Sequence, residues 1–270
     1  MRMLFVVLLS LLLAACGGTE TSSEHPFIVH AFKVGKADSF LIEQNGEYML
    51  IDTGEEDDGQ KIVTYLQSHQ ITTLKALIIT HFDKDHVGGA DTIVNAVDIE
   101  HIYVPDYESD SKQTKQFLNA VDEAKVQLEK LTTNIPISIG DVTGTIYPPM
   151  SSNYSGDNDY SLVVSLPYGE TSFLFAGDIE ATRIADILAD PKIELAHTFL
   201  KVPHHGRFNE QTEALFEAVQ PQYALITSSD KNPEADETVA ALKAVGSKIY
   251  TTRSGDVEFV SDGIKILVID

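Results

Sequence analysis

Residues 80–89 read Thr80-His81-Phe82-Asp83-Lys84-Asp85-His86-Val87-Gly88-Gly89 and directly follow the apolar run Ala76-Leu77-Ile78-Ile79. Such a run predicts a strand buried on both faces. Four potential metal ligands fall within six residues, at positions 81, 83, 85 and 86, which is too dense for one tetrahedral ion alone. His81 and Asp83 can face one side of a loop while Asp85 and His86 turn to another, so the segment favours two adjacent ions. The plainer alternative is a polar loop in which Asp85 caps a helix.

The composition is that of a globular protein, with 270 residues of which 43% are hydrophobic and 22% are charged. This excludes a disordered, collagen-like or coiled-coil chain. The formal net charge of −22 argues against a general nucleic-acid binder, which normally has a basic face. The single cysteine excludes an intramolecular disulfide, a cysteine-rich zinc site and a CxxC redox pair.

The order of β-rich and helical segments predicts one α/β domain over residues 27–270. Three short runs at the start, Phe27–Val34, Ser39–Glu43 and Tyr48–Asp52, indicate an antiparallel meander. Residues 111–131 are expected to form one long amphipathic helix, and residues 162–176 a hairpin. Helices and strands alternate from Ile179 onward. This order of elements is typical of two sheets packed between outer helices.

Further motifs complete a resemblance to the metallo-β-lactamase superfamily, in whose terms residues 81–86 read HxDxDH. Asp52-Thr53-Gly54 is similar to the first motif of the superfamily, Gly177-Asp178 to its later aspartate motif, and Lys201–Gly206 to its late histidine motif. Residues 35–39 and 158–163 resemble one branch, the metallo-hydrolase domain of the competence protein ComEC. The resemblance implies an αβ/βα four-layer sandwich of two mixed sheets.

The resemblance also implies the role of each site residue. His81 and Asp83 would hold one metal, Asp85, His86 and His205 a second, and Asp178 would bridge the two. Asp85 and His204 are the candidate catalytic residues, and His204 would lie behind the ligands or contact substrate unless it exchanges roles with His205. Asn158 would bind a metal or a water, or lie in a turn. Asp52 would orient a ligand histidine.

Arg207 stands where ComEC-like domains usually have serine after HHG. It would clamp a phosphate with two hydrogen bonds, or lie exposed at the start of a helix. The branch also tends to carry a late His-Pro pair, whereas this chain has Asn232-Pro233. Both departures bear on the substrate rather than on the fold.

Residues 1–26 are expected to act in targeting. Arg2 precedes the apolar run Leu4–Leu13, which is short for a membrane span and typical of a signal peptide. The following Leu13-Ala14-Ala15-Cys16 resembles a bacterial lipobox. We therefore expect a lipoprotein signal peptide over residues 1–15, lipidation of Cys16 and a tether over residues 16–26. The alternative is a plain secretory peptide cleaved near Ala15.

The sequence thus predicts an exported hydrolase, lipid-anchored to the bacterial cell envelope, with Zn²⁺ or alternatively Mn²⁺ as its two ions. The paired ions would generate the hydroxide that attacks the substrate. Phosphodiesters are the first substrate class, either small ones or, against the net charge, nucleic acid. Lactones, thioesters and other carboxylic esters are the alternative, and a non-catalytic envelope scaffold is the second alternative.

Overall fold

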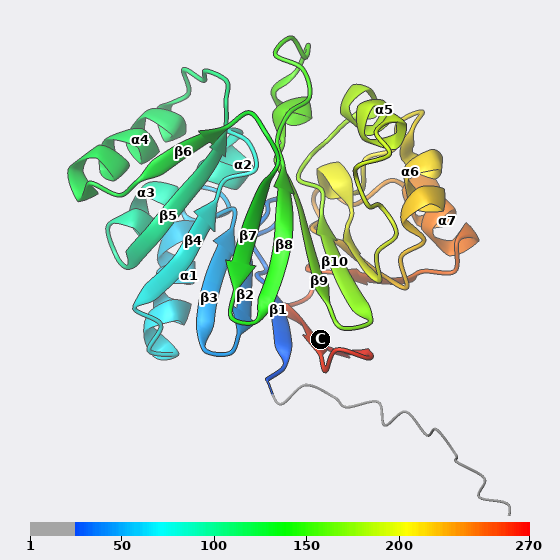
Figure 1. The fold of residues 1–270 in the computed structure, drawn as a ribbon, viewed down its shortest axis with the longest axis horizontal. Coiled ribbons are helices and arrows are strands. Elements are labelled where there is room, and N and C mark those ends of the chain that lie inside the picture. The colour runs from blue at the N-terminus through cyan, green and yellow to red at the C-terminus, as the bar shows by residue number, and fades with distance from the viewer. Residues whose placement is uncertain (1–24) are drawn as a thin grey trace, which may run out of the picture.

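Two β-sheets lie face to face between outer helices in the computed structural model, which describes residues 25–270 (Figure 1). The first sheet has eight strands in the spatial order β15 (Ile266–Ile269), β14 (Val257–Ser261), β1 (Phe27–Ala31), β2 (Phe40–Gln44), β3 (Glu47–Ile51), β4 (Thr73–Ile78), β5 (Asp98–Pro105) and β6 (Leu128–Leu131). The second has seven, in the order β13 (Lys248–Thr251), β12 (Tyr223–Ile226), β11 (Phe199–Lys201), β10 (Thr171–Phe175), β9 (Val163–Tyr168), β8 (Val142–Tyr147) and β7 (Ile135–Ile139).

Both sheets are mixed, because each joins an antiparallel part to a parallel part. In the first sheet β1, β2 and β3 pair antiparallel, as the meander prediction requires, and β3 to β6 pair parallel. In the second sheet β7 to β10 pair antiparallel and β10 to β13 pair parallel. The expected sandwich of two mixed sheets is therefore confirmed.

The helices cover the outer faces of the sandwich, and Figure 1 shows the two groups on opposite sides. Those on the first sheet are α1 (Asp58–Ser68), α2 (Lys84–Val87), α3 (Ala90–Val94) and α4 (Lys112–Ala124). Those on the second are α5 (Ala181–Ala189), α6 (Thr212–Val219) and α7 (Asp236–Ala244). Two 3₁₀ turns, η1 (Asp157–Tyr160) and η2 (Pro203–Gly206), lie in connecting loops.

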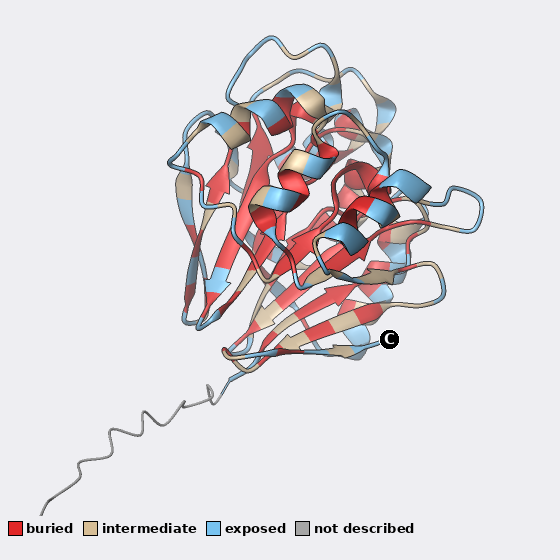
Figure 2. Ribbon diagram, turned by 90° about the vertical axis from the view of Figure 1, so that its right-hand side faces the viewer, coloured by how far each residue is buried: buried red, intermediate tan, exposed pale blue. Residues whose placement is uncertain are grey.

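Three apolar clusters hold these layers together, one between the sheets and one under each group of helices. Strand β4 contributes to two of them, since Ala76 and Ile78 face the other sheet while Leu77 faces the helices, as does Ile79 directly after the strand. This is why residues 76–79 show no polar alternation. Figure 2 shows the same division, with buried strands inside and helices exposed on their outer side.

The prediction of one helix over residues 111–131 is wrong. Helix α4 ends at Ala124, because Lys125 adopts a left-handed conformation (φ 56°, ψ 34°) that reverses the chain. Residues 128–131 then form β6, which pairs parallel with β5. The residue at the reversal is a lysine rather than the glycine that commonly marks a helix end, so the sequence carries no visible stop. Strands β7 and β8 were likewise not predicted from the sequence.

The predicted signal peptide, including Cys16, and most of the predicted tether lie outside the described residues. Across residues 25–270, none of the helices has the length and apolar character that a membrane crossing requires.

Candidate metal centre

The loops that follow the parallel strands of both sheets meet at one edge of the sandwich. Strands β3 and β4 lead into Asp52 and Thr80, and β10, β11 and β12 lead into the loops with Asp178, His205 and Thr227. The carboxyl ends of parallel strands are the usual place for a binding site in an α/β fold. Residues far apart in the sequence thereby come into contact.

The carboxylate of Asp52 fixes one of these residues, His86. Asp52 is fully buried, and it accepts hydrogen bonds from the backbone N–H (2.7 Å) and the hydroxyl (2.7 Å) of Thr80. Its Oδ2 also lies 2.8 Å from His86 Nδ1. A carboxylate can only accept, so Nδ1 carries the proton and Nε2 keeps its lone pair. Asp52 thus lies behind a candidate ligand, on the side of the ring away from Nε2.

His205 has the same tautomer, as assigned from its partner. His205 Nδ1 lies 3.1 Å from the carbonyl oxygen of Thr227, which can only accept a hydrogen bond. His81 Nδ1 lies 3.2 Å from the hydroxyl oxygen of Thr80, which already donates to Asp52. The ring of His205 therefore keeps a lone pair on Nε2, which is the form that binds metals. His81 Nδ1 also lies 3.3 Å from the hydroxyl oxygen of Ser161, and either hydroxyl oxygen can accept its proton, which leaves Nε2 of His81 with a lone pair.

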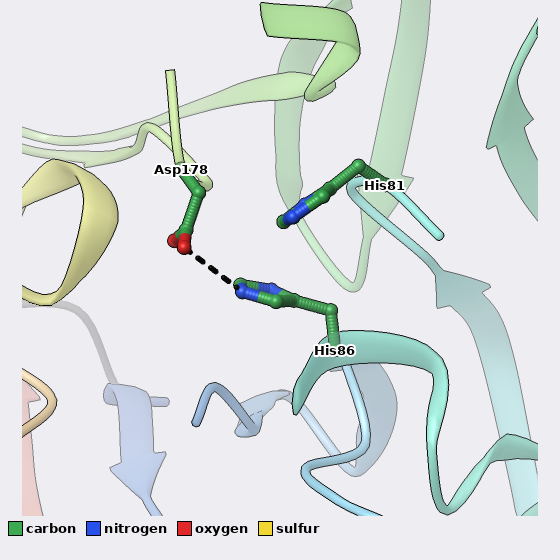
Figure 3. Close-up of side chains that lie close together, drawn as sticks. All are labelled: His81, His86 and Asp178. Carbon is green, nitrogen blue, oxygen red and sulfur yellow. Dashed lines mark ion pairs between the residues drawn. The ribbon is translucent and has the colours of Figure 1, made fainter. Parts of the chain in front are cut away.

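The Nε2 atoms of His81, His86 and His205 are buried and have no hydrogen-bond partner among the described residues. Buried polar atoms are rarely left in this state. Asp178 Oδ2 lies 3.3 Å from Nε2 of His86 and 3.0 Å from Nε2 of His205, at ion-pair distance but without hydrogen-bond geometry. Figure 3 shows Asp178, His81 and His86 directed at the same space.

Four overlapping groups of potential ligand atoms result, each with its atoms within 4.8 Å of one another. One consists of His81, His86 and Asp178, and another of Asp85, His86 and His205. The other two include Asp38, which lies 3.8 Å from His86 Nδ1 and 3.5 Å from His205 Nδ1, on the side of each ring away from Nε2. Imidazole nitrogen and carboxylate oxygen suit Zn²⁺ and Mn²⁺. The donor set and the orphaned nitrogens therefore fit a metal centre.

The buried carboxylates of the cluster favour a positive charge between the histidines, either a proton on imidazole or a bound cation. Burial lowers the pKa of His86, but the carboxylates of Asp178 and Asp52 outweigh it and raise the pKa well above its ordinary value. Burial raises the pKa of Asp178, but His205, His86 and Lys201 hold it well below its ordinary value. A bound cation would satisfy the same carboxylates that otherwise favour a proton on imidazole.

Asp85 and Asp83 differ in their surroundings. Asp85 Oδ2 lies 3.1 Å from Lys36 Nζ and 3.5 Å from His205 Nε2. The side chain of Asp83 is 42% exposed, lies 3.7 Å from His81 Nε2, and belongs to none of the four groups above. Asp83, not Asp85, occupies the N-cap position of α2, and it makes no capping hydrogen bond there. The helix-cap alternative therefore does not account for these carboxylates.

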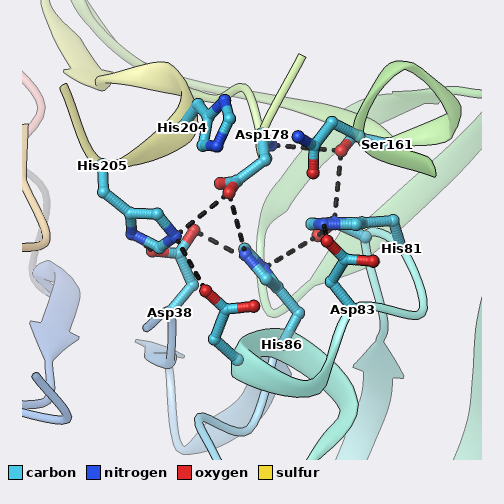
Figure 4. A network of polar contacts seen from close by, with 12 residues as sticks. Asp38, His81, Asp83, His86, Ser161, Asp178, His204 and His205 are labelled. Carbon is cyan, nitrogen blue, oxygen red and sulfur yellow. Dashed lines mark hydrogen bonds and ion pairs between the residues drawn. The ribbon is translucent and has the colours of Figure 1, made fainter. Parts of the chain in front are cut away.

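The other predicted site residues surround a cavity of about 570 Å³ that opens next to Asp178. Its wall includes Asn158, His204 and Arg207. His204 Nδ1 lies 2.9 Å from Glu180 Oε1, and the side-chain amide of Asn158 donates to the same oxygen at 3.3 Å. His204 thus faces the cavity, whereas His205 joins the ligand group (Figure 4). Arg207 is exposed at the cavity wall.

The backbone is strained where these side chains converge. Asp52, His204 and His205 have φ values of 57°, 47° and 53°, in the left-handed region that costs an L-residue about 1–2 kcal/mol. Such strain persists where surrounding contacts enforce it, and it is common at functional sites. The left-handed turn at His204 and His205, rather than regular secondary structure, sets the direction of these two side chains.

Sequence reasoning gave no role to Asp38, Lys201, Glu180 or Thr227. Two of them lie inside motifs that were recognised, since Asp38 belongs to residues 35–39 and Lys201 begins the late histidine motif. A lysine directly after Phe199-Leu200 in an apolar strand was the available signal, because a charge there is buried unless the strand ends. Glu180 and Thr227 carried no such signal.

A family model described as the metallo-β-lactamase superfamily matches residues 33–228, well over half of the chain. ComE operon protein 3 of Bacillus subtilis (strain 168) is 26% identical over 224 residues, which cover 76% of this chain and 28% of that protein. Recombination protein 2 of Haemophilus influenzae is 31% identical over 212 residues, covering 76% and 24%. The chain thus spans about a quarter of the length of these relatives.

Among solved structures, the metallo-β-lactamase fold protein YhfI of Bacillus subtilis aligns with a TM-score of 0.57 at 12% identity, covering 91% of this chain and 99% of that one. At this identity the likeness shows the fold alone. Together with the family match, it confirms the resemblance seen in the sequence. The chain belongs to the metallo-β-lactamase superfamily, as a hydrolase-type domain with a candidate metal site.

Proposed function

We propose that this member of the metallo-β-lactamase superfamily is an exported, lipid-anchored phosphodiesterase that uses two divalent metal ions. One observation carries the proposal: three buried histidines present unpartnered Nε2 atoms beside Asp178 and Asp85, next to a cavity whose wall also carries cations. The similarity to ComE operon protein 3 supports the choice of the ComEC-like branch.

The metals would be held by His81, His86, His205, Asp85 and Asp178, with Asp83 next to His81. Bound there, paired divalent ions lower the pKa of water toward neutrality and stabilise negative charge on the attacking and leaving oxygens. No cysteine is available as a nucleophile within residues 25–270, so hydrolysis by water suits this chain.

Three basic side chains favour a phosphate over a neutral acyl group. Lys36, Lys84 and Arg207 all line the cavity. Lys36 Nζ already holds Asp85 at 3.1 Å, so its ammonium stands at the border between the ligands and the open cavity. Arg207 can donate two parallel hydrogen bonds to phosphate oxygens. An ester or lactone would leave most of this charge unused.

His204 would exchange a proton with the substrate. Its Nδ1 is held 2.9 Å from Glu180, and an Nδ1–H donated to that carboxylate leaves Nε2 as the basic nitrogen. Because His204 lines the cavity, Nε2 can take up the proton that the attacking water releases and give it to the leaving alcohol. Glu180 holds the ring orientation in this role.

The charge of the cavity favours a small phosphodiester over a long nucleic acid. Asp83, Asp157 and Glu180 also line it, and the chain as a whole carries a formal charge of −22. A polyanion gains most of its affinity from lysine and arginine contacts along its length, and the phosphates beyond the cavity would instead meet an acidic surface. A single phosphodiester needs only the local cations.

Turnover of bis-p-nitrophenyl phosphate by the residue 17–270 protein, with Zn²⁺ or Mn²⁺ added, tests the proposal. We expect metal-dependent hydrolysis, and we expect Arg207→Ala to lower kcat/KM about 10–100-fold through loss of a charge-assisted contact worth about 1.5–3 kcal/mol. Lys192→Ala, in an exposed loop, is the matched control and should have no effect. Turnover of lactones or nitrocefin with none of the phosphodiester would contradict the proposal in favour of carboxylic substrates.

A further inference from the structure

Lys201 is a fully buried lysine at the end of β11 that the proposed chemistry does not use. Its ammonium donates to the carbonyl oxygen of Gly177 at 2.8 Å and to Asp178 Oδ1 at 3.1 Å. It also forms a close ion pair with the carboxylate of Asp38. Two of the three ammonium protons are thus donated in hydrogen bonds, and the carboxylate of Asp38 balances the charge through the ion pair.

Such an arrangement is not explained by stability alone. Moving an ammonium and two carboxylates out of water carries a large desolvation penalty, and a buried ion pair is often no more stabilising than an apolar replacement. The neighbouring side chains of this strand, Phe199 and Leu200, show that an apolar residue would suit the layer. A specific geometric role is therefore the better explanation.

The two oxygens of Asp178 show what that role is. Oδ1 is bonded to Lys201, while Oδ2 faces the Nε2 atoms of His86 (3.3 Å) and His205 (3.0 Å). A free carboxylate could rotate and exchange its oxygens, but one held by an ammonium on Oδ1 cannot do so without breaking a charged hydrogen bond. The backbone is held as well, since Lys201 also binds the carbonyl oxygen of Gly177.

Asp38 extends this control to the other loops of the centre. Its Oδ1 accepts a hydrogen bond from the hydroxyl of Thr227 at 2.6 Å and lies 3.5 Å from His205 Nδ1. The hydroxyl of Thr227 is itself 3.0 Å from the same nitrogen. The backbone N–H of Asp38 donates to the carbonyl oxygen of Asp85 at 3.0 Å. One ion pair thus touches the segments that carry Asp178, His205 and Asp85.

We propose that Lys201 and Asp38 form a positioning pair that fixes Asp178 so that Oδ2 alone is presented to the metals. The inference rests on the proposed metal centre and goes beyond it by giving a role to two residues behind the ligands. Asp38 lies 3.5 Å from His205 Nδ1 and 3.8 Å from His86 Nδ1, on the side of each ring away from Nε2. Because Lys201 draws electron density from Asp178, the pair also sets how strongly that carboxylate binds a cation.

The test compares the full mature chain with Lys201→Met and with the double variant Lys201→Met/Asp38→Asn. The single variant leaves two buried carboxylates without their cation, so it can fail to fold. The double variant removes both charges of the pair and keeps the side-chain shapes. His197→Leu is the matched control, because His197 is a buried polar residue just before the same strand, bonded to Ser165 at 2.8 Å and remote from the ligands.

Metal affinity is measured by competition with a chelator, using Zn²⁺ alone, and the ligand field by the visible absorption spectrum of the Co²⁺-loaded protein. We expect the double variant to fold, to lose about 10–100-fold in metal affinity and to show an altered Co²⁺ spectrum. We expect the control to lose stability with no change in either readout. A purely structural role for the pair would leave the Co²⁺ spectrum unchanged.

Wild-type affinity and spectrum in the double variant would overturn the positioning pair while leaving the metal centre intact. Failure of the unaltered protein to bind Zn²⁺ or Co²⁺ would overturn the proposed function and the positioning pair together. The two failures are therefore distinguished by the behaviour of the unaltered protein.

Discussion

Replacing Asp52 by asparagine should switch the tautomer of His86 and thereby weaken metal binding. Asp52 is fully buried and accepts three hydrogen bonds, from the Thr80 N–H (2.7 Å), the Thr80 hydroxyl (2.7 Å) and His86 Nδ1 (2.8 Å). An asparagine side chain has one acceptor, its oxygen, and its NH₂ group can only donate. If its oxygen keeps the bond to the backbone N–H, its NH₂ group faces His86.

A donor at that place makes Nδ1 the acceptor and moves the proton to Nε2, the atom that points at Asp178. Loss of such an outer partner typically costs 10–100-fold in metal affinity, which is about 1.4–2.7 kcal/mol. The metal-free protein should also lose about 1.5–3 kcal/mol of unfolding free energy, the worth of hydrogen bonds to a charged group. Solvent does not screen these hydrogen bonds, because the side chain of Asp52 is not exposed.

Titration calorimetry with Zn²⁺ and urea unfolding in the presence of a chelator measure the two quantities separately. Asp256→Asn is the matched control, since Asp256 also pairs with a histidine, His30 at 3.3 Å, but outside the centre. It should change stability and not metal affinity. Wild-type affinity in Asp52→Asn, with the expected loss of stability, would refute the tautomer argument.

Three further outcomes are expected. Asp178→Ala should abolish hydrolysis and lower the metal content without unfolding the chain; wild-type turnover in this variant would show that the two-metal assignment is wrong. Gly177→Ala should cost at least about 1 kcal/mol in urea unfolding and weaken metal binding, because φ is +55° and a Cβ would lie 2.7 Å from Ser161 Cβ; an unchanged midpoint would contradict this. Asp256→Asn should cost about 1 kcal/mol at pH 7, discounted because the carboxylate is a third exposed. His30, the Lys33 N–H and Lys61 hold the pKa of Asp256 below its ordinary value. The stability it contributes is therefore present above the unfolded pKa of about 4 and is lost as the pH falls through the lower folded pKa, so urea unfolding of the variant and the unaltered protein should converge in acid.

The regular part of the fold was accessible from the sequence because its elements differ in burial. Residues 76–79 are buried on both faces and lack alternation, which identifies an inner strand. The first three strands are separated by short turns and pair as neighbours. The end of α4 could not be predicted from the sequence, since the residue in the left-handed conformation there is Lys125 and not a glycine.

The candidate site also has a part that could be predicted from the sequence and a part that could not. Residues 81–86 are close in the sequence, so their chemistry is visible as a motif. Asp38 and Lys201 meet only because β11 ends at the same edge of the sandwich as the loop before β2. Glu180 pairs with His204 through a turn with two successive left-handed residues. Contacts of this kind depend on tertiary structure and have no local pattern.

Metal analysis of the purified residue 17–270 protein is the decisive experiment for the proposed centre. We expect about two Zn²⁺ or Mn²⁺ ions per chain after reconstitution, as the paired-ion chemistry requires, and hydrolysis of bis-p-nitrophenyl phosphate that a chelator abolishes. Absence of bound metal after reconstitution would contradict this expectation, and the orphaned nitrogens of His81, His86 and His205 would then belong to a scaffold that no longer performs chemistry.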